Sequence, residues 1–211
     1  RRTRSIIAKE RWLEPLAAFI SLQRAKEPLE REAQKYVDPE KEVASPEEAI
    51  AGARDIIAEN ISDDADYRSH IRKLTRQKGR LVSKAKDEEA ESVYEMYYDF
   101  EEPVTKLAGD RILAINRGEK EKFLTVKIEA PQEDILRYLE KKTIHRDNPY
   151  TSPVLREAVE DSYKRLIAPA IEREIRGELT EKAEDGAIRV FGKNLQQLLM
   201  QPPIAGRTVL G

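Results

Sequence analysis

The sequence predicts an all-α, multihelical protein with two subdomains, a long central helix and a minor two-stranded β-ribbon. Charged residues make up 37% and hydrophobic residues 39% of the 211 positions, a balance typical of helix-rich proteins with charged surfaces. Most apolar residues recur at helical spacing, and only two short segments alternate like strands. Ten apolar residues also form a ladder of four-residue steps: Tyr163, Ile167, Ile171, Ile175, Leu179, Ala183, Ala187, Phe191, Leu195 and Leu199.

This ladder predicts an unusual helix. An α-helix repeats every ~3.6 residues, so a strict four-residue repeat drifts around the axis by about 40° per step. We therefore expect a long rod that meets different neighbours on different sides along its length. An oligomeric coiled coil is the alternative, but it needs an average repeat of about 3.5 residues. The drift favours a spine within the molecule.

Three short helices are expected in an N-terminal helical segment, residues 1–40. The first carries Ile6 and Ile7, and the second covers 13–22. The third begins at Pro28, because proline suits the first turn of a helix, and ends near Val37.

Residues 41–150 are expected to form a helical subdomain. Its first helix begins at Ser45-Pro46-Glu47-Glu48, where serine caps, proline occupies the first position and Glu48 completes a capping box. A second helix runs from about Asp63 to Gly79, which is a candidate left-handed C-cap.

The ribbon is predicted from two segments, Leu81–Lys86 and Phe123–Ile128, which are rich in β-branched or alternating residues. Between them we expect an acidic helix around Glu88–Tyr97 and a helix over Asp110–Arg117 that Gly118 ends.

The remainder is predicted to be a helix after Pro131, a loop over 144–152, and the long central helix within 151–203. Pro169 is expected to kink or break this helix, because it lacks a backbone donor and clashes with the preceding turn. Residues 204–211 look like the beginning of a strand, which is not stable alone. We therefore expect them to start a further domain.

Composition and motifs argue against several functions. The chain has no cysteine, which excludes disulfides and cysteine-based zinc sites and suits a cytoplasmic location. The sequence contains no run of ~18 apolar residues, so we expect no membrane partner. His70 and His145 have no partner at metal-ligand spacing, and no phosphate-binding loop or nucleophile elbow is present. We expect no enzyme activity, metal, cofactor or small-molecule substrate; a nuclease would need a carboxylate cluster with a metal.

Charge is segregated along the chain. Residues 67–86 carry eight basic residues and no acid, and residues 87–102 carry eight acids and no base. Basic side chains on a helix can contact nucleic-acid phosphates. The candidate contact residues are Arg1, Arg2, Arg4, Arg68, Arg72, Lys73, Arg76, Lys78, Arg80 and Lys84. The alternative for the basic block, favoured by the near-cancellation of charge, is that the two blocks pair with each other or are solvated surfaces. The alternative for Arg1, Arg2 and Arg4 is a solvated segment.

Several stretches, in order along the chain, resemble the bacterial transcription accessory proteins of the Tex family. They include VASPEEAIAGARDIIAEN at Val43–Asn60, INRGEKEKFLTVKIE at Ile115–Glu129 and SYKRLIAPAIEREIRGELTEKAE at Ser162–Glu184. The others are Arg1–Glu10, Leu13–Ala17, Tyr97–Val104 and Asn194–Gly211. One departure is Arg11-Trp12, where the family pattern has a basic residue and a glycine.

The resemblance implies a larger multidomain protein. Its N-terminal helical region contains a helix-turn-helix-like part and a long central helix, followed by an RNase H-like domain that would begin within 204–211. Helix-hairpin-helix motifs and an OB-fold RNA-binding domain come next. Family members bind nucleic acid and are linked to transcription.

The function implied for this chain is a non-catalytic module that scaffolds nucleic-acid-binding domains and adds weak phosphate-backbone contacts. Its expected partners are RNA or DNA, through the longer protein, and the transcription machinery. The alternative is a pure protein-interaction scaffold that docks on the transcription machinery without touching nucleic acid.

Overall fold

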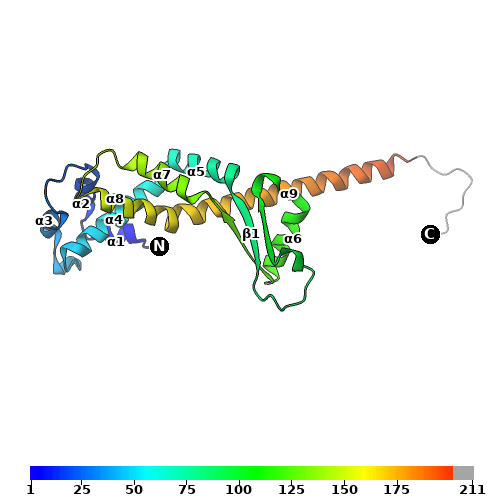
Figure 1. The fold of residues 1–211 in the computed structure, drawn as a ribbon, viewed down its shortest axis with the longest axis horizontal. Helices are drawn as coiled ribbons and strands as arrows, with labels where there is room; N and C mark the ends of the chain where they lie inside the picture. Colours follow the sequence, from blue (N-terminus) through cyan, green and yellow to red (C-terminus); the bar gives the residue numbers. More distant parts are fainter. Residues whose placement is uncertain (202–211) are drawn as a thin grey trace, which may run out of the picture. The chain divides into compact units, whose positions relative to one another are not determined.

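The computed structural model describes residues 1–201 (Figure 1). The chain is mostly helical, as predicted, and carries one small antiparallel sheet. It divides into two compact units, each assembled from two stretches: Arg1–Arg80 with Ile128–Ile175, and Leu81–Lys127 with the residues from Arg176 onward. The sequence-based boundaries at 40, 150 and 203 stay a prediction, and the expected strand within 204–211 lies outside the described residues.

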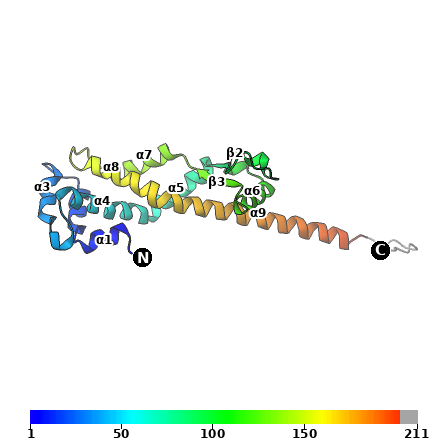
Figure 2. The same cartoon turned by 90° about the horizontal axis from the view of Figure 1, so that it is seen from below.

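The first unit is a helical bundle centred on α4 (Pro46–Asp63), which contacts five other α-helices of the unit. Figure 2 shows α4 running beside α8. The other helices of this unit are α1 (Arg4–Glu10), α2 (Glu14–Ser21), α3 (Leu29–Ala33), α5 (Ala65–Lys78), α7 (Gln132–Thr143) and α8 (Ser152–Asp161). Its largest fully buried side chains are Leu13, Leu16, Ile20, Ile71, Ile135, Leu139, Leu155, Ile167 and Ile175.

The predicted start of α4 is confirmed. The Ser45 hydroxyl accepts a hydrogen bond from the Glu48 backbone N–H at 3.2 Å, with Pro46 at the first helical position. The Glu48 carboxylate reaches back to the N–H of Ala44, at 2.9 Å, rather than to that of Ser45. The cap therefore satisfies two backbone donors, as a capping box does, with one partner shifted by a residue.

The turn between α1 and α2 uses a left-handed backbone. Trp12 has φ 62°, in the left-handed region where glycine is favoured. The indole is 68% exposed, and the Lys41 ammonium lies 3.5 Å from the ring centroid. The departure at Arg11-Trp12 therefore preserves the turn, at some backbone strain.

Pro169 does not break the long helix, contrary to one expectation. Helical backbone continues from α8 through a π-helical turn, Ser162–Ile167, into α9 (Ala168–Leu199). Proline supplies no N–H to the carbonyl four residues earlier, and wider turns of this kind are one way in which a helix accommodates a missing bond. The irregularity thus ends two residues before the proline.

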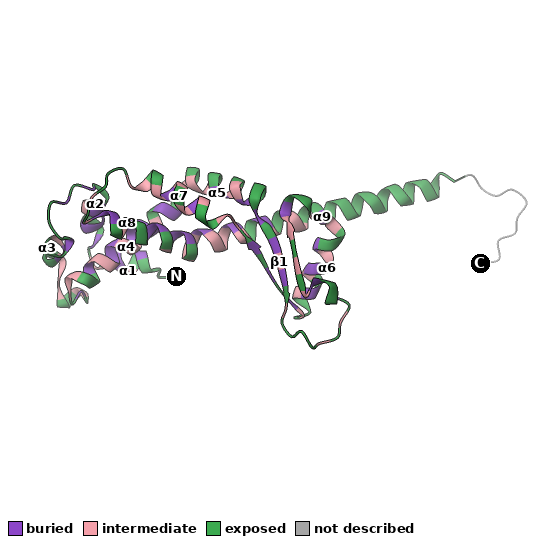
Figure 3. Cartoon of the chain, in the orientation of Figure 1, coloured by how far each residue is buried: buried purple, intermediate pink, exposed green. Residues whose placement is uncertain are grey.

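Burial along the apolar ladder changes with position. Ile167, Ile171 and Ile175 are at most 2% exposed. In contrast, Phe191 is 68% and Leu199 75% exposed, and Figure 3 shows the end of α9 exposed along its length.

The second unit contains a sheet of three strands in the order β2-β1-β3, whereas the sequence predicted a ribbon of two. The strands are β1 (Arg80–Ala85), β2 (Asp99–Pro103) and β3 (Leu124–Glu129), and α6 (Gly109–Lys120) belongs to the same unit. The predicted strands correspond to β1 and β3. The segment DFEEP of β2 was missed because acids and proline are depleted in strands; proline is tolerated here at an edge.

The acidic helix expected around Glu88–Tyr97 is absent from the structure, which has only a 3₁₀ turn over Glu95–Tyr97. Clustered carboxylates at helical spacing repel each other. The tyrosines here are also used in packing: the Tyr94 ring lies 5.8 Å from that of Phe123, and the Tyr97 carbonyl accepts from the Ser83 hydroxyl at 2.8 Å.

Two glycines have roles that the sequence did not predict. Gly118 lies inside α6 instead of ending it; a Cβ there would lie 2.5 Å from the Leu124 Cδ1 atom. Gly79 follows α5 with φ −69° and ψ 154°, so it is not the expected left-handed cap. The chain passes from it directly into β1, and a Cβ at Gly79 would overlap the backbone oxygen of Thr75.

We predict opposite effects for two glycine-to-alanine changes. Gly79→Ala should lower the free energy of unfolding by about 1–3 kcal/mol, because a backbone atom must move. Gly177→Ala is the matched control: nothing lies within 4 Å of its added Cβ on α9, so helix propensity should raise stability by up to about 1 kcal/mol. Urea denaturation of both variants measures the difference, and equal shifts would contradict the packing argument.

Candidate nucleic-acid interface

Helix α5 carries five of the ten candidate residues: Arg68, Arg72, Lys73, Arg76 and Lys78. Asp64 caps the helix by accepting from the Tyr67 N–H at 2.9 Å. Ile71 and Thr75 are buried at 0% and 2% exposure, which turns the basic residues toward the outer faces of the helix. Arg80 and Lys84 follow on β1.

Several of these cations have partners within the first unit. The Arg72 Nε donates to the Glu174 carboxylate on α9 at 2.6 Å, and the Lys78 Nζ lies 3.4 Å from an Asp134 oxygen on α7. Arg68 Nε donates to the Ser62 carbonyl oxygen. The acids that meet α5 here therefore come from α7 and α9, more than 50 residues away in the chain, and not from the acidic block.

The remaining candidates lie in different settings. Lys73 is exposed and has no ion pair within residues 1–201, whereas Arg76 and Arg80 are exposed but engaged in interactions. In the second unit, Lys84 pairs with Asp99, the kind of contact between blocks that the alternative reading predicts. The basic block is thus part exposed and part paired.

The N-terminal arginines lie at and before α1. Arg1, Arg2 and Arg4 are exposed, and Arg2 pairs with Glu10. Arg4 also lines a charged cavity of about 370 Å³ that the sequence did not indicate. Its other lining residues are Arg54, Asp55, Glu157, Glu160, Asp161 and Lys164.

Two carboxyls in this cavity have pKa values displaced in opposite directions. Burial raises the pKa of Asp55 above its ordinary value, against the opposing effect of the Arg165 charge. A hydrogen bond from Arg165, at 2.8 Å, holds the pKa of Asp161 below its ordinary value. Burial without a hydrogen bond thus penalises one charge, and a bidentate partner stabilises the other.

The two histidines are exposed. The His70 ring stacks on Tyr138 of α7 with centroids 3.9 Å apart. The backbone N–H of His145 donates to the Gln23 side-chain oxygen at 2.9 Å. Within residues 1–201, no group of three or more His, Asp or Glu side chains is placed to hold a metal ion, and no helix there is long and apolar enough to cross a membrane.

The chain is a mostly helical module with a long helix, α9, and a basic helix, α5, in its first unit. This chain belongs to the Tex central region-like family, whose model matches residues 23–191.

Relatives extend the similarity over the whole chain. It is 50% identical over 214 residues to protein YdcI of Bacillus subtilis, covering 100% of this chain and 30% of that protein. It is 34% identical to Protein tex of Bordetella pertussis, covering 100% of this chain and 28% of that protein. For the human S1 RNA-binding domain-containing protein 1 the identity is 31%, over 83% of this chain and 19% of that protein. The chain therefore spans less than a third of the length of these relatives.

The displaced carboxyl pKa values predict opposite pH effects. The contribution of Asp161 is present above about pH 4 and is lost as pH falls through its lowered pKa. Asp161→Asn should therefore lower the free energy of unfolding at pH 7, by less than about 1 kcal/mol in this partly solvated setting. Because the pKa of Asp55 is raised, ionising this carboxyl lowers the stability of the folded state as pH rises through that pKa. Asp55→Asn should therefore raise the free energy of unfolding at pH 7.

Urea denaturation between about pH 3 and pH 7 tests both changes, because each variant should converge on the parent at the acidic end. Parallel pH profiles for the parent and the variants would show that neither carboxyl has a displaced pKa.

Proposed function

We propose that this chain is a non-catalytic, cytoplasmic module of a Tex-like transcription accessory protein, which scaffolds nucleic-acid-binding domains and needs no cofactor. Family membership supports this proposal. So do the names of two relatives, the S1 RNA-binding domain-containing protein 1 of Homo sapiens and the transcriptional accessory protein Tex of Neisseria gonorrhoeae. Helix α9, which contributes residues to both units, is the proposed spine.

The finer proposal is that α5 makes weak contacts with the phosphate backbone, with α4 and α5 forming the helix-turn-helix-like part. The observation that carries it is the outward basic face of α5, on which Lys73 is exposed and without an ion pair within residues 1–201. Arg72 and Lys78 are held by partly exposed carboxylates. Such surface pairs are worth about 0–1 kcal/mol, so a polyanion can compete with them.

Neutralising this face should reduce binding. We predict that changing Arg72, Lys73 and Arg76 to glutamine weakens binding of labelled RNA and DNA and lowers the slope of log affinity against log salt by about 2–3, because each phosphate contact releases counterions. The control changes Lys26, Lys106 and Lys120, which are exposed and without ion pairs within residues 1–201, to glutamine. Fluorescence anisotropy at about 50 mM and 200 mM salt measures both.

The ion pairs allow a complementary test that removes no cation. Glu174→Gln with Asp134→Asn releases Arg72 and Lys78 from their carboxylates. Binding should become tighter by several-fold, with a steeper salt dependence, because the same cations now meet phosphate alone. Equal affinities for the parent and all three variants, or no binding at low salt, would refute the phosphate contact.

The second candidate function is protein docking without nucleic-acid contact, and the end of α9 favours it. Exposed apolar side chains there are Ile188, Val190, Phe191, Leu195, Leu198 and Leu199. Within the second unit, α6 and α9 also border a mainly apolar groove of about 750 Å³. Binding insensitive to salt would favour this candidate, and loss of substrate only with a divalent ion would favour a nuclease instead.

A further inference from the structure

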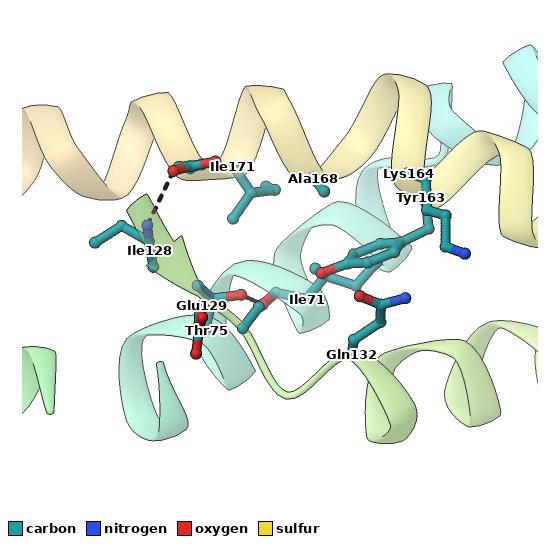
Figure 4. Close-up of a pocket in the computed structure, with 11 residues that line it drawn as sticks. Ile71, Thr75, Ile128, Glu129, Gln132, Tyr163, Lys164, Ala168 and Ile171 are labelled. Atoms are coloured by element: carbon teal, nitrogen blue, oxygen red, sulfur yellow. Dashed lines mark hydrogen bonds between the residues drawn. The ribbon is translucent and has the colours of Figure 1, made fainter. Parts of the chain in front are cut away.

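A cavity of about 490 Å³ lies within the first unit, beside the π-helical turn (Figure 4). Its volume falls within the range of small-ligand sites, about 300–1,000 Å³. One side is apolar: Ile71, Ile128 and Ile171 are 0%, 8% and 2% exposed and all line the cavity. This surface can hold a hydrocarbon stem.

Tyr163 places an unpartnered polar group in this cavity. The residue is only 4% exposed, and its hydroxyl makes no hydrogen bond within residues 1–201. Figure 4 shows the hydroxyl directed away from Lys164 and toward the side where Glu129 and Thr75 lie. Burial, with the nearby Glu172 charge, raises the pKa of this phenol, so it stays neutral and able to accept or donate. The hydroxyl oxygen keeps some contact with solvent, so it faces the open volume of the cavity.

The charges around the cavity define the sign of that partner. The Lys164 ammonium is occupied by Glu160, at 2.6 Å. In contrast, Glu129 and Glu172 have no ion pair within residues 1–201, although one Glu172 oxygen accepts from the Ile128 N–H at 2.9 Å. The Thr75 hydroxyl donates its hydrogen to the Ile71 carbonyl, at 2.8 Å, so its oxygen can act only as an acceptor for a ligand. Two carboxylates and two oxygen acceptors face the cavity, and its one lining ammonium is paired with Glu160, so the lining favours a positively charged ligand.

The position of the cavity adds an independent argument. Tyr163 and Lys164 belong to the π-helical turn. Such turns are rare in proteins, and those that occur are often found at functional sites. Pro169 accounts for the irregularity of the helix, but it does not require a tyrosine with a free hydroxyl at this place.

We propose that this cavity binds a primary ammonium group on a short apolar stem. The ammonium would be held by the carboxylates of Glu172 and Glu129 and the oxygens of Tyr163 and Thr75, and the stem would lie on the three isoleucines. This chemistry has two sources, a free aliphatic amine and the lysine side chain of a peptide. The inference is independent of phosphate binding by α5.

Two probes distinguish the sources: cadaverine, and a capped glycine-rich peptide with a single lysine. Calorimetry and amide NMR shifts of the 211-residue chain measure binding, and we expect a dissociation constant on the order of 0.1–1 mM for at least one probe. Shifts should centre on Ala168 and Ile171. Pentane-1,5-diol replaces both ammonium groups of cadaverine by hydroxyls and should bind at least tenfold more weakly.

Variants identify the site. Tyr163→Phe removes only the unpartnered hydroxyl and should weaken binding about fivefold to tenfold, and Glu172→Gln keeps the acceptor for Ile128 but should weaken it tenfold or more. Glu133→Gln, an exposed residue near the cavity that does not line it, is the matched control and should have no effect. Circular dichroism verifies that each variant is folded.

Binding of cadaverine alone assigns the site to a free amine, and binding of the peptide alone assigns it to a protein partner. The proposal is overturned if neither probe binds at about ten times the expected dissociation constant, if pentane-1,5-diol binds as well as cadaverine, or if the Tyr163 and Glu172 variants bind like the control.

Discussion

The close packing of α4 against α8 and the π-helical turn is the interaction on which the first unit depends. Ala58, a small residue of α4, is 0% exposed at this contact. The two helices approach closely enough for the buried Ser162 hydroxyl to donate to the Ala58 carbonyl at 2.6 Å. Because α1, α2 and α3 also pack on α4, a larger residue in this seam would displace most of the bundle.

The elements that sequence reasoning predicted are those whose signals are local. Ser45-Pro46 caps α4 through atoms three residues apart, and the alternation of Leu124–Glu129 describes its own burial. The errors arose where distant residues decide. Gly118 remains in α6 because Leu124 and Tyr94 pack against it. Strand β2 forms at the edge of the sheet, despite its own acids and proline, because β1 offers it hydrogen bonds. Local propensity carries no record of such partners.

The candidate interface shows the same division. Spacing alone placed Arg68, Arg72 and Arg76 on one helix, because residues four apart share a face. The partner of Arg72 is Glu174, 102 positions away, and no pattern in the sequence identifies that pair. The ion pair between Lys84 and Asp99 joins the basic block to the neighbouring acidic block, as the cancellation of charge predicted. The acids that pair with Arg72 and Lys78 on α5 instead come from other helices of the first unit. Net charge along the chain is therefore a poor guide to which cations a polyanion can reach.

The long helix connects the structural and chemical arguments. A four-residue apolar repeat buries Tyr163, Ile167, Ile171 and Ile175 in succession, and Pro169 falls inside that run. The missing donor is accommodated by a π-helical turn, which holds Tyr163 in the ladder while its hydroxyl remains unpartnered within the described chain. In a regular α-helix each turn holds fewer residues, so the direction of this side chain relative to Ile171 would change. The irregularity that keeps the helix continuous therefore also determines the polar character of the cavity beside it.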